Sequence, residues 1–286
     1  MKVAVTACSG RLGSRLLKLL AADIGPDNVV GICRNPAEVS IQDIEIRAGD
    51  YHSEEQMREA LTGVDSLICI SLPVSPEDRV ALHNNVFEAA RHAGVKQALY
   101  TSVIGNGKEK GTHYEPVQQV NRQTEEALKA SGLNWIIARN GLYLDLDVAH
   151  IVNAGKGDSV FRNNGGSGRC GYITIDELAF AIAKLAISDQ HGKTFNLVGD
   201  CHTQAELVEL VNEVFGFKVR FETISDQECI DKIAADRGEI VARMLAGCYQ
   251  CIREGAFDVP SDFETAAGRA VLPIRTQMEK IKQDLS

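Results

Sequence analysis

The sequence predicts an α/β protein, with a doubly wound parallel sheet followed by a smaller, mostly helical C-terminal part. Two observations support this fold class. Strand-like and helix-like segments alternate through the first two-thirds of the 286 residues, and right-handed crossovers between such segments produce a parallel sheet. A tight turn containing glycines joins the first strand to the first helix, which is typical of the first unit of a nucleotide-binding sheet.

The composition is that of a globular protein with a sizeable core. Hydrophobic residues make up 44% of the chain and charged residues 24%, and the formal net charge is −9. An acidic chain has no general attraction for nucleic acid. No apolar run approaches membrane-spanning length, and a strand directly after Met1 leaves no room for a signal peptide. These features predict a cytoplasmic protein with neither a nucleic-acid nor a membrane partner.

Seven strands are expected in the sheet, and they define the division of the chain. Residues 1–140 form the predicted nucleotide-binding domain, and residues 141–286 form a mixed substrate-binding region that returns one late strand to the sheet. The helix after residue 52 begins with the capping box Ser53-Glu54-Glu55-Gln56. The expected strands are 2–6, 29–33, 44–48, 66–70, 97–103, 134–139 and about 193–198, and the other early helices start at about 12, at Pro76 (to about 93) and at about 117 (to 131).

The pattern changes after residue 140. A glycine-rich loop at 163–168 precedes a short apolar segment at 171–173 and a helix that we expect Asp176 to cap. From about residue 203 the chain is mostly helical, with one short strand near 219–221. Because ligands of such sheets bind beyond the carboxyl ends of the strands, these late segments are expected to cover the crevice and determine substrate choice.

The turn between the first strand and the first helix is the most informative motif. Its glycines are Gly10 and Gly13, and the free N–H groups and helix dipole of such a turn suit a pyrophosphate. The usual spacing would place a third glycine at position 7, where this chain has alanine. The methyl group of Ala7 narrows the backbone geometry available at the tightest point of the turn. An ordinary turn with glycines for packing alone is the alternative interpretation.

The residues after the second strand indicate which dinucleotide binds. Sites selective for NAD place an acidic residue there, whereas this chain has Arg34-Asn35-Pro36. A guanidinium at Arg34 would pair with the 2′-phosphate of NADP, although Glu38 nearby weakens that attraction. The sequence therefore predicts NADP(H), preferred over NAD(H). A solvated loop charge at Arg34 is the alternative.

The cysteines indicate packing rather than chemistry. The pair Cys248 and Cys251 has the spacing of a metal or redox site, but it falls in a helical stretch with no second Cys or His pair at zinc spacing. We therefore expect no metal site. Cys8 lies inside the glycine turn, where it is expected to be a small loop side chain, open to oxidation if exposed.

With these motifs in place, the chain resembles the NmrA-like atypical short-chain dehydrogenase/reductases, which have a Rossmann-like fold. The resemblance is closest to the branch of bacterial NADPH:quinone oxidoreductase and triphenylmethane reductase and covers nearly the whole length. The family has a threonine followed by G-x-x-G-x-x-G where this chain has residues 6–13. The other matching motifs are Arg34-Asn35-Pro36, Gly49-Asp50-Tyr51, Tyr100-Thr101-Ser102, Arg139-Asn140-Gly141-Leu142-Tyr143 and Phe195-Asn196-Leu197-Val198-Gly199-Asp200.

The resemblance implies a cofactor path along the carboxyl ends of the strands. Two of its assignments have structural alternatives: Asp50 as a helix-entry residue and Tyr143 as a core aromatic. The implied path has Ser9, Gly10, Arg11 and Leu12 (with Thr6 and Cys8 of the same loop) at the pyrophosphate, Arg34 at the 2′-phosphate, Asp50 and Tyr51 at the adenine, Ser71 and Leu72 along the ribose, and Thr101, Asn121, Asn140, Gly141 and Tyr143 toward the nicotinamide and substrate.

The sequence departs from its relatives at the position where they often carry a lysine or histidine facing the nicotinamide ribose. Here that residue is Asn121, which forms hydrogen bonds but is no general acid. The Tyr-x-x-x-Lys pair of ordinary short-chain dehydrogenases is also missing, since the fourth residue after Tyr114 is Gln118 instead of lysine. Oxidising an alcohol needs such a base. Reducing a quinone leaves a phenolate-like oxygen, and a phenol has a pKa of about 10, so water or a single hydroxyl can supply the proton.

These observations predict an NADPH-dependent reductase that transfers hydride to a quinone-like or conjugated aromatic small molecule. Tyr143 and Asn121 would position the acceptor and the cofactor. The competing hypothesis is an NADP(H)-binding redox sensor with little turnover. An isomerase, an epimerase or a specialised biosynthetic reductase are further alternatives. The sequence leaves the oligomeric state open, a homodimer included.

Overall fold

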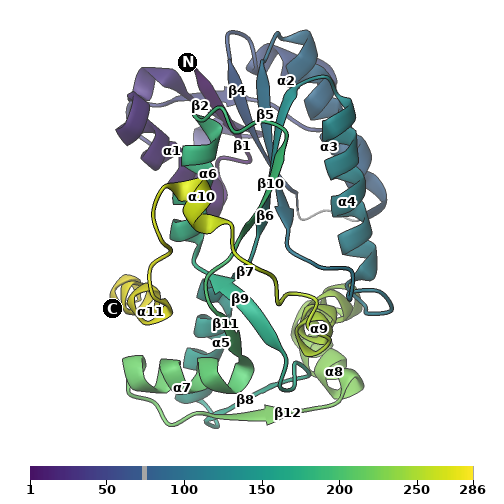
Figure 1. Cartoon of the computed structure of the whole chain (residues 1–286), viewed down its shortest axis with the longest axis vertical. Helices are drawn as coiled ribbons and strands as arrows, with labels where there is room; N and C mark the ends of the chain where they lie inside the picture. Colours follow the sequence, from purple (N-terminus) through teal and green to yellow (C-terminus); the bar gives the residue numbers. More distant parts are fainter. Residues whose placement is uncertain (73–75, 286) are drawn as a thin grey trace.

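A computed structural model describes residues 1–72 and 76–285, and its centre is a seven-stranded parallel sheet (Figure 1). The strand order is β10-β6-β5-β4-β1-β2-β3, so the order reverses between β1 and β4. All seven expected strands are confirmed. Their bounds are β1 Val3–Thr6, β2 Val29–Cys33, β3 Glu45–Ala48, β4 Ser66–Ile70, β5 Gln97–Val103, β6 Asn134–Asn140 and β10 Lys193–Leu197.

Helices cover both faces of this sheet (Figure 1). One face carries α1 (Arg11–Ile24), α6 (Ile175–Ala186) and α10 (Phe263–Ala267). The other carries α2 (Glu54–Ala60), α3 (Pro76–His92) and α4 (Glu115–Ala130). The central strands β1 and β2 are buried along their whole length, because helices exclude water from both of their faces.

The remaining elements form a smaller part beneath the carboxyl ends of the strands (Figure 1). It contains a three-stranded sheet of order β11-β9-β7 and a two-stranded sheet of β12 and β8. Its elements are β7 Leu142–Tyr143, α5 Leu144–Lys156, β8 Val160–Asn163, β9 Arg169–Ile173, β11 Cys201–Thr203, α7 Gln204–Phe215, β12 Arg220–Thr223, α8 Asp226–Arg237, α9 Glu239–Arg253 and α11 Ile274–Asp284.

Two details differ from the sequence-based expectations. Residues 141–286 return not only β10 but also α6 and α10 to the sheet layer, since α6 packs on α1 and α10 packs on α6. The cap of α6 is Thr174, whose hydroxyl accepts a hydrogen bond from the Glu177 N–H at 3.4 Å. Asp176 is therefore not the cap but an acidic residue of the first turn, where it pairs with Arg15.

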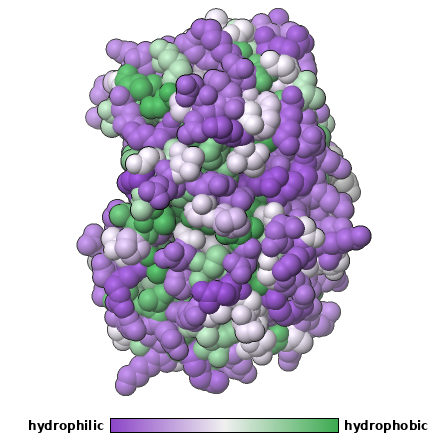
Figure 2. Space-filling view, viewed as in Figure 1, coloured by the Kyte–Doolittle hydropathy of each residue, from purple (hydrophilic) through white to green (hydrophobic). Residues whose placement is uncertain are grey.

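Within residues 1–72 and 76–285, no helix combines the length and the apolar character needed to cross a bilayer. Figure 2 shows a largely hydrophilic face on which hydrophobic residues occur in separate patches.

Candidate active site

The glycine turn has the geometry that the sequence predicts, including the conflict at position 7. Ala7 adopts a φ of +48°, in the left-handed region that glycine tolerates and alanine disfavours. The Gly10 N–H donates to the Ala7 carbonyl at 3.0 Å, which closes the turn, and α1 begins at the next residue. A Cβ on Gly13 would lie 2.6 Å from the Ala7 carbonyl oxygen, so only glycine lets the helix approach the loop this closely.

This turn presents the N-terminal end of α1 to solvent. The first N–H groups of α1 have no acceptors within the helix, and the helix dipole is positive there. Ser9, Gly10 and Arg11 are exposed around them, while the Leu12 side chain is buried beneath. No acidic residue occupies the first turn of α1. The arrangement fits a pyrophosphate.

Ala7→Gly is expected to leave the stability of the protein and its NADPH affinity unchanged or to raise both. Relieving the left-handed alanine gains about 1–2 kcal/mol, and the extra freedom of glycine in the unfolded chain offsets about 0.4–1 kcal/mol of it. Thermal unfolding and an NADPH titration check this. Ser159→Gly is the matched control, since Ser159 has a φ of +59° outside the turn. It should gain similar stability with no change in NADPH affinity, and a loss of NADPH affinity in Ala7→Gly would contradict the account.

Thr6 and Tyr51 face the interior rather than the cofactor crevice. Their hydroxyl oxygens lie 2.5 Å apart, and the Tyr51 hydroxyl also donates to the Ile70 carbonyl at 2.9 Å. The Thr6 hydroxyl donates to the Ile68 carbonyl at 3.1 Å. Both residues are buried, Thr6 completely. These bonds join the ends of β1 and β4 to the loop after β3. The two side chains therefore stabilise the backbone that borders the crevice.

Cys8 is likewise directed into the core. Its side chain is fully buried, and its backbone N–H donates to the Ile32 carbonyl at 3.2 Å. Burial is the main reason that the pKa of its thiol rises to about 12. The thiol is therefore neither exposed nor activated for oxidation, and its N–H is not free for a phosphate.

Arg34 stands exposed at the end of β2, where the sequence placed the 2′-phosphate contact. The acidic residue that could have opposed a phosphate, Glu38, accepts a hydrogen bond from the Asn35 amide at 2.7 Å. Asp50 accepts hydrogen bonds from the His52 backbone N–H and ring, at 3.1 and 2.9 Å. These bonds, with the more distant charge of Arg34, lower the pKa of Asp50. The edge beyond β2 and β3 therefore presents the Arg34 guanidinium and the ionised Asp50 carboxylate.

Ser71 and Leu72 follow β4 and are held by neighbouring side chains. The Ser71 N–H donates to the Thr101 hydroxyl at 3.0 Å, and the Leu72 N–H donates to Nε2 of His83 at 3.4 Å. The Thr101 hydroxyl thus stabilises the backbone of the segment that follows β4. Burial lowers the pKa of His83 to about 3, and the charge of Arg79 adds to this fall, so the imidazole is neutral.

A cavity of about 290 Å³ opens at the carboxyl ends of β4, β5 and β6, where Ser71, Thr101, Asn121, Asn140 and Tyr143 come together. Both polar atoms of the Asn121 side chain form hydrogen bonds there. Its amide nitrogen donates to the Val117 carbonyl at 2.9 Å, and its oxygen accepts the Tyr100 hydroxyl at 3.0 Å. The buried Oδ1 of Asn140, in contrast, has no hydrogen-bond partner among the described residues. Such an acceptor at the wall of a cavity fits a ligand amide.

Gly141 and Tyr143 form the next part of the wall. A Cβ on Gly141 would lie 2.7 Å from the Gly171 carbonyl oxygen, so this segment passes close to β9. Tyr143 is half-buried, and its phenol has a pKa raised by burial, with a hydrogen bond from Asn140 acting in the opposite direction. Its hydroxyl is therefore protonated at neutral pH.

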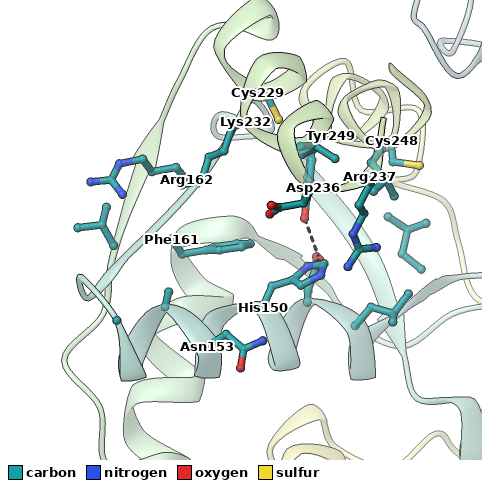
Figure 3. Close-up of a pocket in the computed structure, with 18 of the residues that line it drawn as sticks. His150, Asn153, Phe161, Arg162, Cys229, Lys232, Asp236, Arg237, Cys248 and Tyr249 are labelled. Carbon is teal, nitrogen blue, oxygen red and sulfur yellow. Dashed lines mark hydrogen bonds and ion pairs between the residues drawn. The ribbon is translucent and has the colours of Figure 1, made fainter. Parts of the chain in front are cut away.

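A second cavity of about 470 Å³ lies between α5, β8, α8 and α9 and was not predicted. It shares Leu142, Tyr143 and Leu146 with the first, so the two form adjoining chambers. Figure 3 shows His150 of α5 on one side of it and Asp236 and Arg237 of α8 on the other. Residues from segments about ninety positions apart meet here, which no local pattern in the sequence reveals.

The floor of this second cavity contains a buried carboxylate. Asp147 accepts the Tyr172 hydroxyl at 2.9 Å and the Tyr249 hydroxyl at 3.0 Å. Burial raises the pKa of Asp147, and the two hydroxyls partly offset this effect. Cys248 of α9 also lines this chamber, while Cys251 of the same helix is buried.

The described residues fit a dinucleotide along one path. The helix end at Ser9–Arg11 suits the pyrophosphate, Arg34 suits a 2′-phosphate, and the unpaired Asn140 oxygen suits a carboxamide. These features lie at the carboxyl ends of parallel strands around the point where the strand order reverses, which is where such sheets bind ligands.

Known proteins match this chain over most of its length. A family model described as NAD(P)H-binding matches residues 8–185. Quinone oxidoreductase 2 of Escherichia coli (strain K12) is 30% identical over 231 residues, 79% of this chain and 79% of that protein. An NmrA-like family domain-containing oxidoreductase of Aspergillus flavus is 28% identical over 239 residues, 81% of this chain and 77% of that protein.

A solved structure gives the same result in three dimensions. The crystal structure of the Citrobacter sp. triphenylmethane reductase complexed with NADP(H) matches with a TM-score of 0.89 at 31% identity, covering 99% of each chain. Sequence and fold thus agree with the resemblance that the motifs indicated. The chain belongs to the NAD(P)H-binding family, as an NmrA-like reductase of the atypical short-chain dehydrogenase/reductase type.

Proposed function

We propose that this protein uses NADPH to reduce a quinone-like or conjugated aromatic small molecule. The observation that carries the proposal is the chemistry of the 290 Å³ cavity. The described residues that line it include no lysine, histidine, aspartate or glutamate. A site that oxidises alcohols needs such a base, whereas reduction of a conjugated acceptor does not. The names of the quinone and triphenylmethane reductases that the chain resembles support the same class of acceptor.

The residues of the cavity would act mainly by positioning. When bound, NADPH supplies a hydride from its dihydronicotinamide ring. Asn140 would hold the carboxamide through its unpaired Oδ1, and Asn121 would keep the ribose side of the cavity in place through Tyr100. Tyr143 would pack against the acceptor from the wall that separates the two chambers. Correct placement of two flat rings supplies most of the rate in such a reaction.

Preference for NADPH over NADH is part of the proposal and depends on Arg34. Arg34→Ala is expected to weaken NADPH binding by about 1.5–3 kcal/mol, a charged hydrogen bond, and to leave NADH almost unchanged. Titrating both cofactors against both proteins measures this. Arg58→Ala, an exposed arginine of α2, is the control and should change neither affinity. Equal affinities of the unmutated protein for NADPH and NADH would end the claim.

Steady-state NADPH oxidation with simple quinones tests the proposed function. We expect saturable turnover that depends on both substrates and exceeds the rate without protein. The competing hypothesis of a redox sensor predicts tight NADPH binding without turnover. That combination, obtained with benzoquinones, naphthoquinones and triphenylmethane dyes alike, would overturn the proposal.

A further inference from the structure

We propose that the second cavity, of about 470 Å³, is a binding subsite for an apolar chain carried by the acceptor. The substrate class is then a quinone ring with an alkyl or prenyl substituent. This inference rests on the proposed function, because the ring of such a molecule would occupy the first cavity beside the cofactor. It assigns the choice of acceptor to the surroundings of α5, α8 and α9.

The sizes of the two cavities give the first argument. Pockets for small ligands have volumes of roughly 300–1,000 Å³. The first cavity, at about 290 Å³, has to hold the nicotinamide ring as well as the quinone ring. A substituent on the quinone therefore needs additional space. The second cavity provides about 470 Å³ directly beside the first.

The junction of the two cavities gives a chain its path. Leu142, Tyr143 and Leu146 line both cavities, so the junction is formed by two aliphatic side chains and one aromatic ring. Leu146 is 40% exposed there, although it follows directly on the strand and helix start that carry Tyr143. A chain that crosses the junction would cover Leu146, and removing apolar surface from water is favourable.

The wall of the second cavity suits a hydrocarbon chain. Phe161 of β8, Ile233 of α8 and Leu245 of α9 line it from three elements, and Figure 3 shows the Phe161 ring facing the space above α5. Among the described residues, none that lines this cavity has a buried side-chain nitrogen or oxygen without a hydrogen-bond partner. Asn140 of the first cavity does have one. The first cavity therefore suits a polar group, and the second suits an apolar one.

The charged side chains of the second cavity favour no ionic ligand. Asp147 accepts two tyrosine hydroxyls and lies 3.9 Å from the His150 ring, and Arg162 donates to Asp158 at 2.6 Å. The other charged residues are exposed on α8 and have opposite signs. They are Lys232, Asp236 and Arg237. A chain end without a charge fits such a mixed rim better than a carboxylate or an ammonium group does.

A series of benzoquinones with methyl, propyl, hexyl and nonyl substituents tests the inference. At saturating NADPH, KM should fall about fourfold for each methylene that enters the cavity, the gain from burying one CH₂ group, and then level off when the cavity is full. The value of kcat should change little, because the ring stays in the first cavity. A KM independent of chain length would overturn the inference.

Substitutions on α9 locate the effect in the second cavity. Leu245→Glu places a charge in its wall and should abolish the dependence of KM on chain length. Ile240→Glu is the matched control, since Ile240 is an exposed residue of the same helix outside the cavity, and it should retain the dependence. An equal dependence in Leu245→Glu and the unmutated protein would overturn the inference.

Binding of 4-alkylphenols, which accept no hydride, separates this inference from the proposed function. Calorimetric titration of the protein with bound NADP⁺ should show one site whose Kd falls with chain length, and Leu245→Glu should remove that trend. Chain-dependent binding without reduction of any quinone would refute the proposed function and keep the subsite. Reduction of quinones with no chain-length dependence in KM or in Kd would refute the subsite and keep the proposed function.

Discussion

Gly13→Ala is expected to remove most NADPH binding and to destabilise the fold. The added methyl group would lie 2.6 Å from the Ala7 carbonyl oxygen and 2.7 Å from the Cys8 Cα, both rigid backbone atoms. Overpacking of this kind costs about 1–3 kcal/mol of unfolding free energy. Moving the turn also separates the N–H groups from the phosphate. Losing two charge-assisted hydrogen bonds corresponds to an affinity loss of about 100-fold or more.

The graded control is Gly10→Ala in the same turn. Its Cβ would meet the Ala7 carbonyl oxygen at 3.3 Å, and the backbone φ of −76° suits alanine. A displacement of a few tenths of an ångström relieves that contact, so the loss of NADPH affinity should be smaller than for Gly13→Ala. Calorimetric titration with NADPH and thermal unfolding measure both variants. Unchanged NADPH affinity in Gly13→Ala would show that the cofactor binds elsewhere.

Two substitutions of Tyr143 should have very different effects on quinone reduction. Tyr143→Phe keeps the ring between the two cavities and should cost little, because burial keeps the hydroxyl protonated and the acceptor needs no strong acid. Tyr143→Ala opens the wall between the chambers and should lower kcat/KM by about 100-fold through lost positioning. Asn121→Ala should act mainly on NADPH affinity. The Asn121 amide is hydrogen-bonded to Val117 and Tyr100, so its loss would disturb the ribose side of the cavity and leave the acceptor side in place.

The measurement is kcat/KM of the three variants with one quinone, first with NADPH saturating and then with NADPH limiting. The Phe variant is the matched control for the Ala variant, since only the ring distinguishes them. If Tyr143→Phe alone abolishes turnover, the hydroxyl is the proton donor, and the account of an acceptor that needs no acid is wrong.

The sequence was sufficient to predict the strands of the sheet and the position of the glycine turn. Continuous apolar runs mark strands that are buried on both faces, and each of the seven recurs in the structure within one or two residues. The conflict at Ala7, seen in its positive φ, is a local property of the turn, which is why the missing glycine at position 7 indicated it. The position of Arg34 was predictable for the same reason, because it depends only on where β2 ends.

Features that depend on distant segments were not predictable in this way. The matching motifs placed Thr6 and Tyr51 at the cofactor, but only the folded structure, which brings the loop after β3 to the end of β1, shows that their hydroxyl oxygens lie 2.5 Å apart in the core. The second cavity requires α5 and α8 to lie opposite each other.

Transfer of deuterium from NADPH labelled at C4 of its nicotinamide ring to a quinone tests the central claim most directly. The reaction would be run as a single turnover, with the protein in excess over the labelled cofactor and with a matched reaction of unlabelled NADPH. The account predicts that the quinone is reduced in proportion to NADPH consumed, and that deuterium slows the reaction when it replaces the transferred hydrogen. Tight NADPH binding with no reduction of the quinone, or consumption of NADPH at the same rate with and without the protein, would contradict it.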